Sequence, residues 1–144
     1  MAPTTPVQVE HIRRLQLTRK AMEMFIDDPE VEEIVKGCFV RVLVDKKTKD
    51  KVYRLSEVVG ITYDSKYTLG DYGKTDKHMT LQYGDQISTC KIDHISNSVF
   101  SESEFNNFVT MMNACGVPML TEQDVLYKLR KVKTYIQLCE QDDA

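Results

Sequence analysis

Gly37-Cys38-Phe39-Val40-Arg41-Val42-Leu43-Val44 is the stretch that decides the fold. Its aromatic and β-branched residues favour a strand, and the polar residues 45–50 that follow favour a turn. We therefore expect a hairpin whose return arm covers residues 52–63. That arm is long for one straight strand, and Gly60 indicates a bulge or bend within it.

Further strands are predicted downstream of this hairpin, at residues 66–69, 78–83 and 87–95. Turns between them are indicated by Gly70, Gly73 and Tyr83-Gly84-Asp85. Five short strands with tight turns predict a small, strongly curved antiparallel sheet or partial barrel.

Helical patterns precede the sheet. Residues 10–26 read as helix in two pieces, with Thr18 as the N-cap of the second piece. A third, short helix is predicted with Asp28 as N-cap, Pro29 at the first helical position and Gly37 as terminator.

Helical patterns also follow the sheet. Ser101 with Glu104 three residues later makes a capping box, and Gly116 ends the helix that begins there. Thr121 caps the last helix. The order of helices, antiparallel strands and helices predicts an α+β fold with a curved sheet flanked by N- and C-terminal helices.

The length and composition of the chain are typical of one globular domain. The chain has 144 residues, 42% of them hydrophobic and 28% charged. Residues 1–8 carry prolines without periodicity and are expected to form a flexible tail. No apolar run approaches the roughly 20 residues of a membrane helix, and the first nine residues lack the pattern of a signal peptide. We expect a soluble, intracellular protein, monomeric as an isolated domain.

No catalytic or metal-binding constellation is evident in the sequence. His11, His78 and His94 are scattered without an H-x-x-x-H spacing, and the four cysteines form no C-x-x-C pair. We therefore expect neither an enzyme nor a cofactor or metal site. The formal charge of −3 argues against broad electrostatic attachment to nucleic acid.

Two arginines lie inside apolar strand patterns. Arg41 and Arg54 must therefore face solvent, a carboxylate or a ligand. If the two strands pair, these arginines are expected to share one face, with Tyr53 as a further contact on the sheet.

Three motifs in order and register resemble the Plus-three domain. They are Gly37 to Arg41, Val52 to Val58 and Ile95 to Phe105. This domain belongs to the Rtf subunit of the Paf transcription elongation complex, and a plant group joins it to SWIB and GYF domains. The resemblance implies a Tudor-like or PAZ-like sheet within a domain covering residues 9–139, followed by a tail at 140–144.

The same resemblance implies a nuclear function. Rtf domains of this type bind phosphorylated C-terminal repeats of the large subunit of the DSIF elongation factor, which attaches the Paf complex to elongating RNA polymerase II. Contact with single-stranded DNA has also been ascribed to them. Phosphothreonine is best held by convergent arginines, because their planar donors bind its oxygens in bidentate fashion.

A phosphate site follows residue by residue from the resemblance. Arg19 falls on a family arginine of the phosphate pocket, whereas two further basic positions of the animal Rtf pattern fall on Met24 and Ser88. Lysine is a point charge without the planar fork of arginine, so it is an incomplete substitute. The candidate substitutes are Lys20, Lys36 and Lys91.

Two alternative ligands remain open at this point. A histone tail or other chromatin peptide would use an aromatic surface, for which the candidates are Tyr53, Tyr63, Tyr67, Tyr72 and Tyr83. Single-stranded DNA would use stacking tyrosines with a basic loop formed by Lys66, Lys74 and Lys77.

Overall fold

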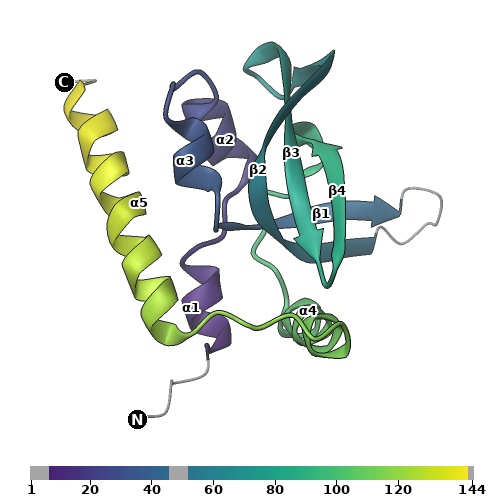
Figure 1. The fold of residues 1–144 in the computed structure, drawn as a ribbon. Helices are drawn as coiled ribbons and strands as arrows, with labels where there is room; N and C mark the ends of the chain where they lie inside the picture. The colour runs from purple at the N-terminus through teal and green to yellow at the C-terminus, as the bar shows by residue number, and fades with distance from the viewer. Residues whose placement is uncertain (1–6, 46–51, 143–144) are drawn as a thin grey trace.

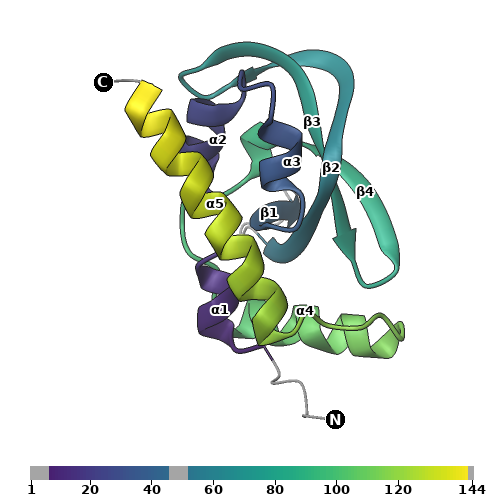
Figure 2. The same cartoon turned by 60° about the vertical axis from the view of Figure 1, so that its left-hand side comes forward.

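The computed structural model describes residues 7–45 and 52–142, and these ranges form one curled sheet with helices packed around it (Figures 1 and 2). The sheet is antiparallel, with strand order β1-β2-β3-β4. Its strands are β1 (Phe39–Asp45), β2 (Val52–Leu69), β3 (Gly73–Tyr83) and β4 (Gln86–Lys91). The predicted α+β class, with a curved sheet flanked by N- and C-terminal helices, is confirmed.

The first two strands form the predicted hairpin. Phe39 lies opposite Glu57 and Leu43 opposite Tyr53, while the expected turn falls largely on residues 46–51, outside the described ranges. The pairing of β2 with β3 shifts between Val58 and Gly60, which confirms the predicted bulge. This bulge lies where the long strand bends over the core.

The prediction of five strands was wrong, because residues 66–69 are the end of β2 and not a separate strand. Tyr67 pairs with Thr75 and Leu69 with Gly73, so β2 continues beyond a second irregularity in its pairing. The last predicted strand, at 87–95, was too long. It ends at Lys91, and Ile92–His94 form the 3-10 turn η1.

Three helices precede the sheet: α1 (Val9–Arg13), α2 (Arg19–Phe25) and α3 (Val31–Val35). Thr18 caps α2 as predicted, because its hydroxyl accepts a hydrogen bond from the Ala21 amide. Asp28 is not the N-cap of α3. Its carboxylate accepts instead from the Glu30 amide, and Glu30 is the N-cap, so the helix begins later than predicted. Gly37 ends the segment with a φ of 91°.

The described fold includes two residues that precede the expected domain start at residue 9. Gln8 is the N-cap of α1, and Val7 packs against the core, although both were assigned to the tail. At the other end, α5 continues to Asp142.

The helices after the sheet are α4 (Glu102–Ala114) and α5 (Glu122–Asp142). Both predicted caps are confirmed. Ser101 and Glu104 exchange hydrogen bonds between side chain and amide, and Thr121 and Asp124 do the same. None of the helices in the described ranges is long and apolar enough to span a membrane.

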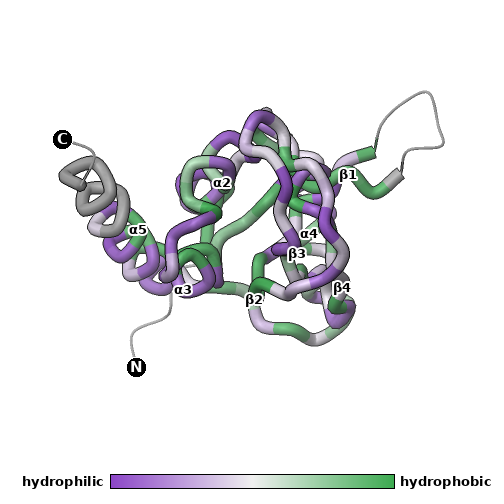
Figure 3. The backbone as a smooth tube through the Cα atoms, turned by 90° about the horizontal axis from the view of Figure 1, so that it is seen from above, coloured by the Kyte–Doolittle hydropathy of each residue, from purple (hydrophilic) through white to green (hydrophobic). Residues whose placement is uncertain are grey.

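The core has two parts, one on each face of the β1–β2 hairpin. Val40, Val42 and Val58 belong to an inner cluster inside the curl of the sheet, which α2 and α3 close. Phe39 and Leu55 belong to an outer cluster, which packs against residues of α1, α4 and α5. Figure 3 shows hydrophobic and hydrophilic residues alternating along the helices and strands. This pattern is expected where one side of each element packs against a hydrophobic cluster and the other side faces solvent.

The free edge of β1 is covered by two other segments. The Leu17 amide donates to the Phe39 carbonyl at 2.7 Å, and the Phe39 amide donates to the Leu15 carbonyl at 3.0 Å. Further along, the Ser96 amide donates to the Arg41 carbonyl at 2.8 Å. Residues 15–17 and 95–96 thus occupy the edge that β2 leaves open.

Arg41 ties β1 to α4. Its Nε donates to the Glu104 carboxylate at 2.9 Å, and its guanidinium also donates to the Ser96 hydroxyl at 3.1 Å. The guanidinium lies 3.9 Å from the centre of the Tyr53 ring. Because the Arg41 and Glu104 side chains are only 20% and 14% exposed, this ion pair is largely shielded from water.

Arg41→Ala is expected to lower the free energy of unfolding by about 2 kcal/mol, since it leaves the shielded Glu104 carboxylate without its partner. Urea denaturation of Arg41→Ala, Glu104→Ala and the double variant gives the coupling energy. The exposed Arg130→Ala should change stability by less than about 0.5 kcal/mol. A coupling energy near zero would contradict the assigned pair.

Candidate functional site

Two adjoining hollows lie beside the sheet. The first, here called the Arg19 hollow, is lined by Arg19, Leu43, Tyr53, Asp93, His94, Ile95, Ser96 and Asn97. The second, here called the seam groove, has a volume of about 620 Å³ and runs between β1 and β4. Leu43 and His94 line both hollows, so the two form one continuous surface.

Arg19 is held in place through its own helix. It is the first residue of α2, and the next amide, that of Lys20, donates to the Asn97 side chain at 2.8 Å. This bond anchors α2 to the segment between η1 and α4. In the described part of the chain the Arg19 guanidinium has no hydrogen bond or ion pair, whereas nearby Asp93 accepts from the Gly70 amide at 3.1 Å. Arg19 is therefore available to an anion.

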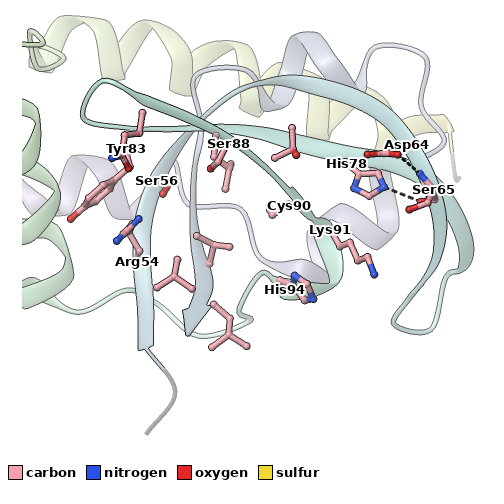
Figure 4. A pocket seen from close by; sticks show the side chains of 16 residues that line it. Arg54, Ser56, Asp64, Ser65, His78, Tyr83, Ser88, Cys90, Lys91 and His94 are labelled. Atoms are coloured by element: carbon pink, nitrogen blue, oxygen red, sulfur yellow. Dashed lines mark hydrogen bonds between the residues drawn. The ribbon is translucent and has the colours of Figure 1, made fainter. Parts of the chain in front are cut away.

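The seam groove has one strand on each side. Val42 to Val44 of β1 form one wall and Ser88 to Lys91 of β4 the other. Figure 4 shows Arg54 and Tyr83 toward one end, and Lys91 and His94 near the centre. The lining contains two cationic residues, Arg54 and Lys91, and one acidic residue, Asp64, so its permanent charge is positive. This balance favours an anionic ligand.

His78, which also lines the groove, has its interactions satisfied by the protein. Its Nε2 lies 2.9 Å from the Ser65 carbonyl, and its ring meets Tyr67 edge-on with centres 5.0 Å apart. Since His78 is also buried, we assign it to packing.

The structure brings together only some of the residues expected to bind phosphate. Arg19 lines the Arg19 hollow, while Ser88 and Lys91 line the seam groove. Lys20 is exposed beside Arg19. Lys36 is exposed at the C-cap of α3, next to Gly37, which approaches Lys128 of α5, and Lys36 lines neither hollow.

Met24 is 76% exposed but lies on another side of α2 from Arg19. Five positions of an α-helix correspond to about 140° of rotation. A basic residue at this position would point away from the Arg19 hollow.

Arg41 and Arg54 lie on opposite faces of the hairpin, so the expectation of a shared face was wrong. Arg54 pairs with Val42, and side chains alternate along a strand, which places Arg54 on the groove side and Arg41 on the outer side. Arg41 is bound to Glu104, and Tyr53 lies beneath its guanidinium. Arg41 is therefore part of the structural framework.

Four of the five candidate tyrosines each contact a different partner within the protein. Tyr67 is buried and donates to the Lys77 carbonyl, while Tyr72 donates to the Asp27 carboxylate. Tyr53 lies under Arg41, and Tyr83 lies under Arg54 at 4.1 Å. Tyr63 is 66% exposed. This arrangement is unlike an aromatic cage, in which several rings face one cation.

The three lysines expected in one basic loop are strand residues instead. Lys66 lies in β2, and Lys74 and Lys77 lie in β3. Lys66 and Lys74 are exposed, but the Lys77 ammonium donates to the Ile26 carbonyl at the end of α2. Lys77 thus serves the fold.

Sequence reasoning missed η1 as a source of site residues. His94 lines both hollows and Asp93 one of them. The turn forms because Ile92 and Ile95 are both buried, which extended backbone would not allow for residues three apart. The spacing of three residues between these two isoleucines was the feature of the sequence that could have predicted the turn.

Two cysteines, one directly before β1 and one in β4, are poor nucleophiles. Burial raises the pKa of the Cys38 thiol to about 11 and that of the Cys90 thiol to about 12, so both remain protonated at neutral pH. Within the described ranges, no group of three His, Cys, Asp or Glu residues is arranged to hold a metal ion.

Comparison with known proteins gives several related sequences. A "Protein RTF1 homolog" of Arabidopsis thaliana is 24% identical over 86% of this chain and 20% of its own length. An RNA polymerase-associated protein of Schizosaccharomyces pombe is 27% identical over 85% of the chain and 22% of its own length. "Zinc finger CCCH domain-containing protein 19" of Arabidopsis thaliana is 29% identical over 85% of the chain and 7% of its own length. The chain thus spans about a fifth or less of these relatives.

The family comparison agrees with the three motifs. The model of the Plus-3 domain matches residues 11–113, from α1 to the end of α4. All three motifs lie inside this match, and the match covers more than half of the sequence. The chain therefore belongs to the Plus-3 domain family.

Proposed function

We propose that this chain is a non-enzymatic recognition module of the transcription elongation machinery. It binds a phosphorylated C-terminal repeat of the DSIF large subunit and thereby attaches the Paf complex to elongating RNA polymerase II in the nucleus. The family and the relatives named as RTF1 homolog or RNA polymerase-associated protein support this proposal. We propose residues 9–139 as the functional unit.

The observation that carries the proposal is the available Arg19 guanidinium in the Arg19 hollow, which adjoins the seam groove. A phosphate group carries nearly two negative charges and binds most strongly to an arginine that is not already paired. Arg41 and Arg54 are less available, because each is stacked on a tyrosine and Arg41 is also bound to Glu104. Lys91 and Arg54 give the adjoining groove the charge that an acidic peptide requires.

The other expected cations contribute unequally. Lys91 lines the groove and is a suitable second cation, whereas Lys36 lines neither hollow. Ser88 lines the groove without supplying charge. We therefore propose a phosphate site centred on one arginine, weaker than a site with several convergent arginines.

The alternative ligands have less support. A cationic histone tail would meet a positive groove lining and tyrosines that are engaged separately. Single-stranded DNA would meet Lys66 and Lys74, but Lys77 is bound to Ile26, and Tyr63 is the one expected tyrosine that is largely exposed. We do not adopt either ligand.

Arg19→Ala is expected to weaken binding of a phosphothreonine repeat peptide about 10- to 100-fold, the usual effect of losing a charged hydrogen bond. Fluorescence anisotropy with a labelled peptide measures this change. The unphosphorylated peptide should bind wild type about as weakly as the phosphopeptide binds Arg19→Ala. Arg130→Ala removes a charge from exposed α5 and should leave affinity unchanged. Equal binding of both peptides to wild type would refute the proposal.

Ser88→Arg is expected to strengthen phosphopeptide binding about tenfold, because an arginine there adds a positive charge to the groove wall. Met24→Arg adds the same charge at an exposed position directed away from Arg19, so affinity should change less than about twofold. Anisotropy titrations of both variants at one salt concentration make the comparison. An equal gain in both would indicate a general effect of net charge and contradict a localised site.

A further inference from the structure

The outer edge of β4 is unpaired within the described residues. β4 is the last strand of the sheet and forms its ladder with β3 alone. Its side chains are exposed, except for the partly buried Cys90. An uncovered strand edge presents a row of amide and carbonyl groups to which another chain can add by main-chain hydrogen bonds.

The opposite edge of the sheet is covered along the first half of β1. Residues 15–17 and 95–96 bind the free side of β1, as described above. The fold therefore covers β1 from Phe39 to Val42 and leaves the edge of β4 open toward the seam groove, of which Ser88 to Lys91 form one wall.

The hairpin geometry identifies which groups of β4 are free. Tyr83 and Gln86 pair across the two-residue turn Gly84-Asp85, and the ladder continues without a shift to His78 and Lys91. In such a hairpin the flanking pair is hydrogen-bonded and the following pairs alternate. The main-chain groups of every second residue thus point away from β3, and these residues are Ile87, Thr89 and Lys91.

The edge leads toward the Arg19 hollow. β4 runs from Gln86 to Lys91, a length of about 20 Å at the usual rise per residue, and passes directly into η1, whose His94 borders the hollow. Arg54 and Lys91 supply positive charge along this course. The edge and the charge together fit an extended, anionic peptide better than a helix or a neutral segment.

We propose that the phosphorylated peptide binds as a fifth strand on β4, pairing with the main-chain groups of Ile87, Thr89 and Lys91. Its phosphorylated residue then lies beyond Lys91, at Arg19. This proposal rests on the proposed function and adds the mode of binding. Main-chain pairing supplies affinity that does not depend on peptide side chains, and Arg19 supplies the selection for phosphate.

Thr89→Pro tests the pairing. Proline removes the outward amide of Thr89, and it is tolerated on an edge strand where that amide does not bond to the neighbouring strand. Thr89→Ala keeps the amide and measures how much the Thr89 side chain contributes to the affinity for the phosphopeptide. We expect Thr89→Pro to bind the phosphopeptide at least about tenfold more weakly than Thr89→Ala. Glu102→Pro is the proline control, because Glu102 is the first residue of α4, where proline is favoured, and it should bind like wild type.

A second measurement keeps the test independent of folding. Phosphopeptides N-methylated at one residue at a time are titrated against the unaltered protein, and alternate positions are expected to lose about tenfold or more in affinity. Thermal unfolding confirms that Thr89→Pro is folded. If it is not, the N-methylated series decides the matter.

The outcomes separate this inference from the proposed function. If neither Thr89→Pro nor any N-methylated peptide loses affinity while Arg19→Ala does, strand addition is refuted and phosphate recognition stands. If wild type fails to bind the phosphopeptide, both proposals are refuted. Binding of single-stranded DNA without binding of the phosphopeptide also refutes both, because an oligonucleotide has no peptide backbone to pair with a strand.

Discussion

The structure depends on β1 being bound on all four sides. Phe39 enters the outer cluster, Val40 and Val42 enter the inner cluster, β2 pairs along one edge, and residues 15–17 and 95–96 bind the other edge. An extended strand has only these four directions in which to interact. Because β1 uses all of them, the positions of α2, η1 and the start of α4 follow from contacts with this one strand, and so does the position of Arg19.

Local chemistry made much of the fold predictable. The caps at Thr18, Ser101 and Thr121 are formed by residues at most three positions apart, and a glycine inside a strand pattern, as at Gly60, is a local sign of a bulge. The Asp28 assignment was wrong for an equally local reason. Its carboxylate binds an amide two residues ahead in a turn, and the same sequence preference serves both a turn and a helix cap.

The site was less predictable because it is assembled across long distances in sequence. Arg41 and Arg54 both lie inside apolar strand patterns, but the pairing of Arg54 with Val42 places them on opposite faces, and only the register reveals this. The bond from Lys77 to Ile26 joins residues 51 positions apart. His94 and Arg19 meet because η1 folds back against α2, a contact that no single motif encodes. The family motifs lie on the buried framework, so they identify the fold better than the ligand.

The exposed side chains of β4 have a consequence for how this family can diversify. A strand that is held mainly by main-chain hydrogen bonds, with side chains outside the core, can change its residues at little cost in stability. Selection can therefore rewrite this strand for a new ligand while Phe39, Phe100 and Phe108 keep the same core. Divergence at Ser88 is then compatible with an unchanged fold, and β4 is the part of the sheet where sequence similarity should fade first.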